Sequence, residues 1–330
     1  RRTCHVVGRI EALAYAMTSV NVTWVRNLPG SFEGSGVAVV PDGVVLKLLL
    51  NGTAGVVGLD RNGSVRWQLS PTSFFWADGE RLWFGGRQLR LVQASNGIIL
   101  AERDLSTGVV VLAPGVAMIG GVAQGRLMGF DAGLGTLWEW TERPSVWSAI
   151  PNYLWCLDES HSCLVSLPGL ERKKVRLSIP AGGSYTSFEH EGVMAHVAVA
   201  DGESCGVSWR QGTEVWRRMV EPRGLAVKWD DSFIFSGAQL HRIEIATGKT
   251  VWARPLEPLG CVARVFGDEI CFATASGRIQ VVDCRTGETT FDGSLPAVDG
   301  EPQVPHAVLP CGPDKLFLVM YTELHCIART

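Results

Sequence analysis

The stretch RIEIATGKTVWARP, residues 242–255, contains the features that decide the fold. An apolar strand leads into a polar turn that ends in Gly248, and Trp252 follows four residues later on a second strand. Glycine supplies the positive φ that tight hairpin turns require. The pattern therefore predicts a β-hairpin with a large aromatic side chain on its second strand.

Six more stretches repeat this hairpin along the chain. They are VVGLDRNGSVRWQL (56–69), LVQASNGIILAERDL (91–105), MGFDAGLGTLWEW (128–140), LVSLPGLERKKVRL (164–177), GVSWRQGTEVWRRM (206–219) and QVVDCRTGETTFDG (280–293). A second set of turns, rich in Pro, Asp, Asn and Gly, alternates with the hairpins at intervals of about 40 residues, a spacing typical of repeat proteins. These turns lie at 41–43, 77–79, 114–115, 151–152, 191–192, 230–231, 267–268 and 312–314. Each repeat therefore holds four short strands, A to D.

Short strands at this spacing, without helical periodicity, indicate stacked antiparallel sheets. A lone four-stranded sheet cannot bury both faces, so the sheets must pack against one another around a ring. The sequence predicts an all-β fold, an eight-bladed β-propeller of four-stranded antiparallel blades, with seven blades as the alternative. Residues 1–330 are expected to form one domain, with blades that start near 34, 73, 108, 145, 184, 223, 260 and 304.

The last repeat, residues 306–328, contains strands A, B and C only. Its missing D strand is expected from the other end of the chain, where VNVTWVRNL (20–28) carries Trp24 in the setting of a D strand. Residues 19–28 are therefore predicted to be a closing strand, and 1–18 an N-terminal extension. This pairing would join both ends of the chain in one blade and close the ring.

The composition indicates a folded protein. Hydrophobic residues make up 46% of the chain and charged residues 19%, which is typical of a globular domain. A net charge of −3 gives no general attraction to nucleic acid. No run approaches the roughly 18 apolar residues that span a bilayer. We therefore expect neither nucleic acid nor membrane insertion.

Nine cysteines are present, an odd number whose spacing follows no disulfide framework. Many of them stand in apolar strand contexts, such as Cys271 in EICFATA. Buried reduced thiols in a reducing compartment fit this usage best, so a cytoplasmic location is expected. A removed export signal is the alternative.

The unit of an apolar strand, a polar turn with Gly and a later Trp resembles the pyrroloquinoline-quinone-like repeat, also called the quinoprotein dehydrogenase-like repeat. The copies that carry the resemblance are IATGKTVW (245–252), DCRTGETTF (283–291) and LDRNGSVRW (59–67). The resemblance implies a propeller fold, but quinone-dependent members also carry an adjacent Cys-Cys pair and a calcium site. No such pair occurs in this sequence. We therefore predict no cofactor.

Two groups of polar residues have the chemistry of a site, although the chain carries neither a G-x-S-x-G nor an H-E-x-x-H motif. Cys156, Asp158, His161 and Cys163 are zinc-ligand types on one predicted hairpin, but their spacing matches no zinc finger. A polar loop between two buried cysteines is the simpler interpretation. We predict neither a metal site nor a catalytic residue here.

The second group lies around a predicted turn, where His190 and His196 flank Glu189 and Glu191. A His/Glu pair near the channel would suit acid–base or metal-assisted chemistry. Turn residues and a histidine packed in a strand are the simpler interpretation.

Compact blades with short loops favour a binding role. The favoured function is a non-enzymatic scaffold that binds a protein or peptide partner through one rim and the channel mouth, as a monomer or as a subunit of a hetero-complex. Alternatives are a metal-assisted lyase or hydrolase with a central-channel site, and quinone or sugar binding. Tyr and Arg are enriched at interaction hot spots. The D–A and B–C loops offer these candidate binding residues: Arg87, Arg143, Tyr185, Glu221, Arg223, His306 and Tyr321.

Overall fold

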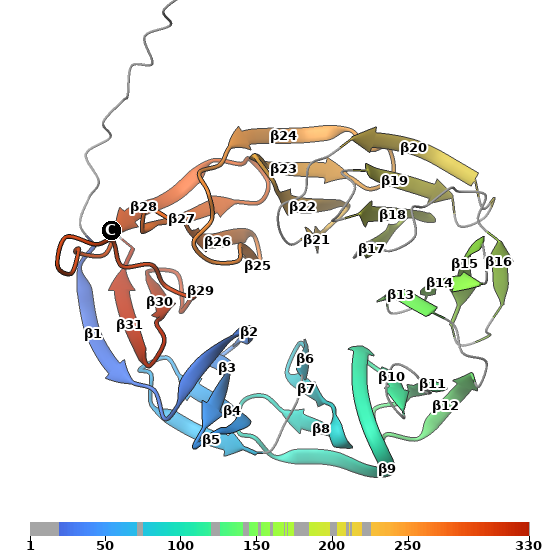
Figure 1. The fold of residues 1–330 in the computed structure, drawn as a ribbon, viewed down its shortest axis with the longest axis horizontal. Helices are drawn as coiled ribbons and strands as arrows, with labels where there is room; N and C mark the ends of the chain where they lie inside the picture. Colours follow the sequence, from blue (N-terminus) through green and yellow to red (C-terminus); the bar gives the residue numbers. More distant parts are fainter. Residues whose placement is uncertain are drawn as a thin grey trace, which may run out of the picture.

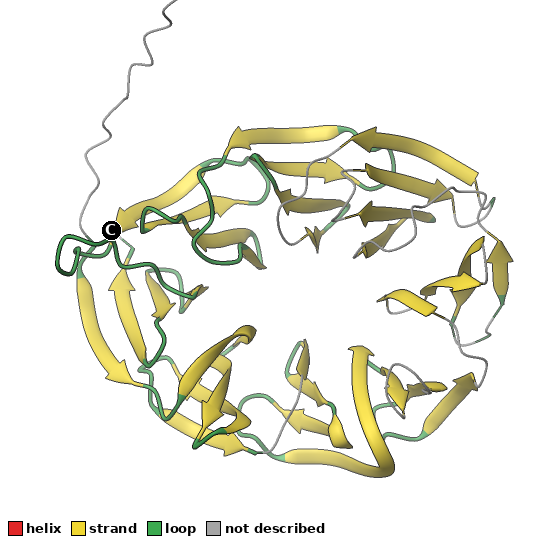
Figure 2. Ribbon diagram, viewed as in Figure 1, coloured by secondary structure: helices red, strands yellow, loops and turns green. Residues whose placement is uncertain are grey.

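The computed structural model describes residues 20–70, 75–119, 126–140, 145–150, 153–158, 161–167, 169, 171–174, 185–198, 203–208, 211, 213–219 and 226–329. All regular elements within these ranges are β-strands, numbered β1 to β31, and Figure 2 shows strands and loops without a helix there. The described residues accordingly contain no helix that could cross a bilayer. The all-β class predicted from the sequence is confirmed.

The strands of the first half form three sheets. The first contains β2 (Ser31–Val40), β3 (Gly43–Leu50), β4 (Thr53–Asp60) and β5 (Val65–Leu69). The second contains β6 (Phe75–Asp78), β7 (Arg81–Phe84), β8 (Gly86–Gln93), β9 (Ile99–Ala113), β10 (Val116–Ile119), β11 (Arg126–Phe130) and β12 (Thr136–Trp140). The third contains β13 (Ser145–Ile150), β14 (Tyr153–Asp158), β15 (His161–Ser166) and β16 (Arg172–Lys174).

The strands of the second half form four sheets. Three of them follow the chain: β17 (Tyr185–His190), β18 (Val193–Ala198), β19 (Glu203–Ser208) and β20 (Thr213–Met219); β21 (Ala226–Trp229), β22 (Ser232–Ser236), β23 (Gln239–Glu244) and β24 (Thr250–Pro255); β25 (Arg264–Phe266), β26 (Glu269–Ala273), β27 (Arg278–Asp283) and β28 (Thr289–Ser294). The fourth combines β29 (Ala307–Pro310), β30 (Lys315–Val319) and β31 (Glu323–Ala328) with β1 (Val22–Asn27). We call this last group the closing sheet.

Figure 1 shows the sheets following one another around an oval ring. Near the centre lie β2, β6, β13, β17, β21, β25 and β29, and at the outside lie β5, β12, β16, β20, β24, β28 and β1. Neighbouring strands in each sheet are antiparallel and, apart from β1, adjacent in the chain. The predicted turns and hairpins therefore connect neighbours, as in the predicted four-stranded repeat. Propeller-like matches to known structures, given below, agree with this architecture.

The strand β9 differs from the prediction of separate four-stranded sheets. Its first part pairs with β8 and its last part with β10, so one seven-stranded sheet replaces two separate ones. The stretch from Leu105 to Gly108 (LSTG) contains neither Pro nor Asp, and the extended backbone continues through it. An outer strand thus runs directly into the inner strand that follows it.

The closing sheet has the predicted strand pairing. The strand β1 pairs antiparallel with β31, with Trp24 opposite Cys326 and Val25 opposite His325. Figure 1 shows β1 lying along the outer side of β31. The N-terminal strand is therefore the outer strand of the C-terminal sheet.

Tryptophans on several of the outer strands tie one sheet to the next. Three of them donate an indole N–H to the carbonyl that follows the third strand of the next sheet: Trp67 to Ala94 at 2.9 Å, Trp216 to Ile245 at 2.8 Å and Trp252 to Cys284 at 2.9 Å. Because the partners lie about one repeat ahead in the chain, the same bond recurs around the ring. The recurring Trp of the sequence pattern is thus an inter-sheet contact.

Glycines on both sides make room for these rings. A Cβ at Gly206, on the same sheet as Trp216, would lie 2.0 Å from the indole nitrogen, and a Cβ at Gly248, on the next sheet, would lie 2.6 Å from the ring. Gly248 also has φ of +69°, which favours glycine. Trp24 meets Gly63 in the same way, since a Cβ there would lie 2.4 Å from its ring. The strand β1 therefore makes the outer-strand contact that the other sheets make.

An arginine two residues after the Trp position adds a second tie, which the sequence analysis missed. Arg218 donates from Nη1 to the Gly248 carbonyl at 2.6 Å and to Thr250 Oγ1 at 2.8 Å. Arg254 repeats both bonds with Gly287 and Thr289. The sequence carries this arginine as W-x-R, but the neighbouring residues in the chain do not show which groups its side chain reaches.

The core lies between adjacent sheets. The closing sheet packs on both sides, through Leu316 and Ile327 against the β25–β28 sheet and through Phe317 and Cys326 against the β2–β5 sheet. The cysteines whose side chains the structure describes are buried, as predicted from their apolar contexts. They are Cys205, Cys261, Cys271, Cys284, Cys311 and Cys326.

Candidate binding sites on the closing sheet

An aromatic cluster lies at one end of the closing sheet. It consists of Phe32 at the start of β2, His306 before β29 and Tyr321 after β30, and we call it the rim cluster. The ring centroids of His306 and Tyr321 are 6.2 Å apart, and those of Phe32 and His306 are 6.3 Å apart. Phe32 is buried, whereas 60% of Tyr321 is exposed. The cluster therefore presents exposed aromatic surface on a buried aromatic base.

The backbone holds the rim cluster in place. The Phe32 amide donates to the Tyr321 carbonyl at 2.8 Å, and the His306 amide donates to the Val319 carbonyl at 2.8 Å. The first bond connects segments that are far apart in the sequence, and the second extends the pairing of β29 with β30. Their loops are thus fixed to each other before any partner arrives.

A bulge of β2 lies directly beside the rim cluster. Phe32 pairs with Leu48 and Val37 with Leu46, so residues 33–36 stand opposite a single residue, Lys47. Lys47 Nζ lies 2.8 Å from Glu33 Oε2 in a partly buried ion pair. Arg264 of β25 donates to the Gly34 carbonyl at 3.3 Å. Charged side chains thus border the aromatic surface.

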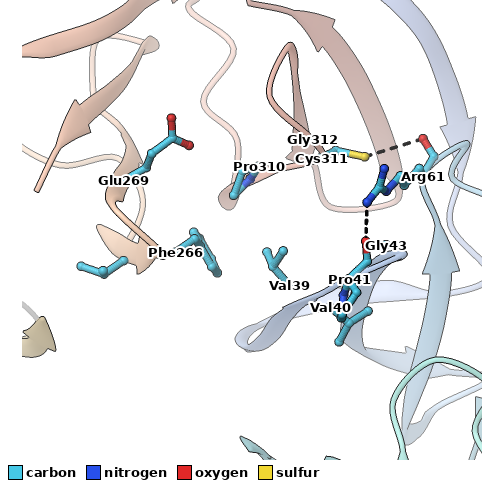
Figure 3. A pocket seen from close by; sticks show the side chains of 12 residues that line it. Val39, Val40, Pro41, Gly43, Arg61, Phe266, Glu269, Pro310, Cys311 and Gly312 are labelled. Carbon is cyan, nitrogen blue, oxygen red and sulfur yellow. Dashed lines mark hydrogen bonds between the residues drawn. The ribbon is translucent and has the colours of Figure 1, made fainter. Parts of the chain in front are cut away.

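A pocket of about 560 Å³ lies at the other end of the same strands (Figure 3). Four turns form it, those between β2 and β3, between β4 and β5, between β25 and β26, and between β29 and β30. We call it the seam pocket. Its lining residues are Val39, Val40, Pro41, Gly43, Arg61, Val265, Phe266, Gly267, Glu269, Pro310, Cys311 and Gly312.

Arg61 and Glu269 are the charged residues of the seam pocket lining. Arg61 Nη2 donates to the Pro41 carbonyl at 2.5 Å. Glu269 is held by Arg329, whose Nη1 lies 3.0 Å from Oε2 while Nη2 bonds Oε1. Burial raises the pKa of the Cys311 thiol to about 11, and its Sγ lies 3.6 Å from the Arg61 carbonyl. The thiol is therefore neutral at physiological pH.

The predicted binding residues are only partly brought together. His306 and Tyr321 meet in the rim cluster, whereas Arg87 lies exposed on β8, in another sheet. Arg143, Glu221, Arg223 and the side chain of Tyr185 lie outside the described residues. Phe32 and the seam pocket were not predicted from the sequence. Phe32 stands in GSFEGSG (30–36), a glycine-rich stretch that is too loose to count as a nucleotide-binding motif.

The two histidines near the β17–β18 turn do not form a joint site. His196 pairs with Ser187 and His190 with Val193, so the side chains of His190 and His196 project to opposite faces of the sheet. His196 is buried, with Nδ1 3.2 Å from Ser187 Oγ, and burial lowers its pKa to about 3. It is therefore neutral and packed in the strand, which agrees with the simpler interpretation.

The hairpin with the zinc-ligand residue types forms as β14 and β15. Cys156 stands opposite Cys163 and Asp158 opposite His161 in the strand register, but the side chains lie outside the described residues. Among the described residues, no three His, Cys, Asp or Glu side chains are grouped as a metal site would require.

Residues 195–305 match the family model described as outer membrane protein assembly factor BamB, over less than half of the chain. No curated protein matches the sequence. The matched residues include the stretch 242–255 that predicted the fold.

Solved propellers resemble nearly the whole chain. BamB from Moraxella catarrhalis has a TM-score of 0.57 at 13% identity, over 94% of this chain and 99% of that one. Quinohemoprotein alcohol dehydrogenase from Comamonas testosteroni has a TM-score of 0.59 at 11% identity, over 94% and 76%. The C-terminal WD40 domain of Sif2 has a TM-score of 0.61 at 11% identity, over 94% and 99%. The chain therefore has a β-propeller fold, and residues 195–305 match the repeats of the BamB family model, which are of the PQQ-like type that its hairpins resemble.

Proposed function

We propose that this protein is a scaffold without a catalytic role, which binds a segment of another protein through the rim cluster and the adjoining channel mouth. The observation that supports this proposal is the exposed Tyr321–His306 pair on the buried Phe32. Aromatic side chains bring a large contact area with few rotatable bonds, and Tyr is enriched where binding energy concentrates. The family model is named for an assembly factor, which agrees with a binding role.

The surroundings of the rim cluster suit a protein partner. Interaction surfaces combine an apolar centre with a polar border, and here the Lys47–Glu33 pair lies beside the aromatic centre. The inter-segment hydrogen bonds of Phe32 and His306 hold the surface in one arrangement. A preorganised surface loses little conformational entropy on binding.

Affinity purification from the source organism, with quantitative mass spectrometry, tests this function. Wild-type protein, the double variant Tyr321→Ala/His306→Ala and the control Met219→Ala, which changes a residue 72% exposed on β20, would be compared as baits. A partner recovered with the wild type and the control, and lost with the double variant, would support the rim cluster as its site. Equal recovery with all three baits would refute it.

We also propose that the sheets form a closed ring of eight blades. In this interpretation β9 serves two blades, as the outer strand of one and the inner strand of the next, and the closing sheet is the eighth blade. The pairing of β1 with β31 and the ring of sheets in Figure 1 support it. An experimental structure that counts seven blades, or that separates β1 from β31, would contradict it.

The remaining part of the proposal is a monomer, or a subunit of a hetero-complex, in the cytoplasm. The buried free cysteines support a reducing compartment. Thiol titration of denatured protein, isolated from its source without reductant, should find all nine cysteines free. Disulfides in that preparation would place the protein in an oxidising compartment.

A further inference from the structure

The seam pocket has the size of a ligand site and lies apart from the rim cluster. Its volume of about 560 Å³ falls within the range of roughly 300–1,000 Å³ common for ligand pockets. It lies at the Pro310 end of β29, whereas His306 precedes the other end, about 13 Å away at roughly 3.3 Å per strand residue. A ligand here would therefore occupy a second site, beyond the proposed function.

The walls of the seam pocket are apolar and come from three sheets. Val39 belongs to β2, Phe266 to β25 and Pro310 to β29, and all three are partly exposed. Figure 3 shows these side chains between Arg61 on one side and Glu269 on the other. Partly exposed apolar side chains in a concave site favour burial of an apolar group of a ligand.

The charge balance of the seam pocket favours an anion. Glu269 is neutralised by the two hydrogen bonds from Arg329, and the Cys311 thiol is uncharged. Arg61 bonds only carbonyl oxygen at Pro41, and no carboxylate among the described residues lies in an ion pair with it. The lining therefore carries one positive charge that is not compensated there. The fork of an arginine guanidinium matches a carboxylate with two hydrogen bonds.

We infer that the seam pocket binds the free carboxylate at the C-terminus of a partner polypeptide whose last residue is apolar. Such a residue places a carboxylate and an apolar side chain on the same carbon, which matches a pocket with Arg61 on one side and the apolar Val39 and Phe266 across from it. Capture of a terminal carboxylate is an established mode of peptide recognition. Because the polypeptide ends at this carboxylate, only one chain segment leads out of the pocket. One opening to solvent is therefore sufficient for the partner.

Fluorescence anisotropy with the full chain and a labelled peptide tests this inference. The probe is Ser-Gly-Ser-Gly-Phe with a fluorophore on its N-terminus and a free C-terminal carboxylate. We expect saturable binding, and affinity at least about tenfold weaker for the C-terminal amide, since a charge-assisted hydrogen bond is lost. Arg61→Gln should weaken binding of the free-acid peptide by the same factor of about ten. The C-terminal amide should bind this variant and the wild type with equal affinity.

Matched controls separate this site from the rim cluster. Arg66→Gln changes a nearby exposed arginine outside the lining and should bind the probe as the wild type does. The double variant Tyr321→Ala/His306→Ala should also bind the probe with wild-type affinity. A failure of partner binding at the rim cluster would therefore not change the outcome of this test. Circular dichroism and thermal unfolding of Arg61→Gln check that the variant is folded. Phe266→Ala, which removes the apolar wall, provides an independent measurement and should also weaken binding.

Two further ligands distinguish the sources of the carboxylate. The first ligand is an internal Glu-Phe sequence with both ends blocked, which lacks the terminal carboxylate. The second is free N-acetyl-phenylalanine, which lacks the preceding peptide chain. Both are expected to bind at least about tenfold more weakly than the probe. Equal binding of either ligand would overturn the assignment to a polypeptide C-terminus. Equal binding of acid and amide, unchanged binding by Arg61→Gln, or no binding of the probe at millimolar concentration would overturn the site itself.

Discussion

Trp216 offers a direct test of how the sheets are held together. Its ring is buried between Gly206 and Gly248, stacks on Phe233 at 6.3 Å and donates to the Ile245 carbonyl at 2.8 Å. The substitution Trp216→Ala removes the ring, and Trp216→Phe keeps an aromatic ring but removes the N–H donor. The two variants therefore separate packing from hydrogen bonding.

The magnitudes follow from burial. A tryptophan buries roughly 200 Å² of surface, and at about 25 cal/mol per Å² this gives an upper value of about 5 kcal/mol. Measured Trp→Ala substitutions in cores cost about 3–5 kcal/mol, so we expect about 4 kcal/mol for Trp216→Ala. Trp216→Phe should cost about 1–2 kcal/mol, because the Ile245 carbonyl loses its donor.

Urea unfolding, followed by circular dichroism, measures both variants. The midpoint should fall for each variant, further for Trp216→Ala, with little change in the slope of the transition. The control is Trp76→Ala, since Trp76 is 46% exposed and should lose less than about 1 kcal/mol. A loss below about 1 kcal/mol for Trp216→Ala, or equal losses for Trp76 and Trp216, would refute the assignment of inter-sheet packing to the buried ring.

Three other predictions concern separate features of the fold. Trp24→Ala should cost about 2–4 kcal/mol in urea unfolding, because Trp24 packs edge-on against Phe317 at 5.4 Å in the closing sheet; a wild-type midpoint would show that this contact is not stabilising. Arg254→Ala should cost about 1–2 kcal/mol, since it loses two hydrogen bonds to the next sheet, and an unchanged midpoint would argue against that tie. Burial lowers the pKa of His196 from 6.5 to about 3, so between these values the unfolded chain binds a proton that the folded chain does not, and the free energy of unfolding falls as the pH falls. His196→Gln should remove this part of the pH dependence, which unfolding at pH 7 and about pH 5 measures; the same pH dependence in wild type and variant would contradict it.

Much of the fold could be predicted because its determinants are local. The turn of 242–255 requires Gly248 at a positive φ, and the apolar pattern around it specifies a strand pair through neighbours in the chain. Repetition of that unit implies sheets that must cover one another. The short last repeat together with Trp24 also predicted the pairing of β1 with β31.

The candidate sites depended on the tertiary structure. Phe32 and Tyr321 are almost the length of the chain apart, and only the closing sheet places their segments within hydrogen-bonding distance. The seam pocket combines turns from three sheets. The positive charge of Arg61 is uncompensated in the lining because Arg329 donates a hydrogen bond to Glu269. The sequence by itself determined the strands and turns, apart from the continuous β9, and the partner of β1, because these follow from spacing and backbone preference. Which side chains face one another across the sheets was decided by lateral packing, since such contacts join residues one repeat or a whole chain apart and no local pattern encodes them.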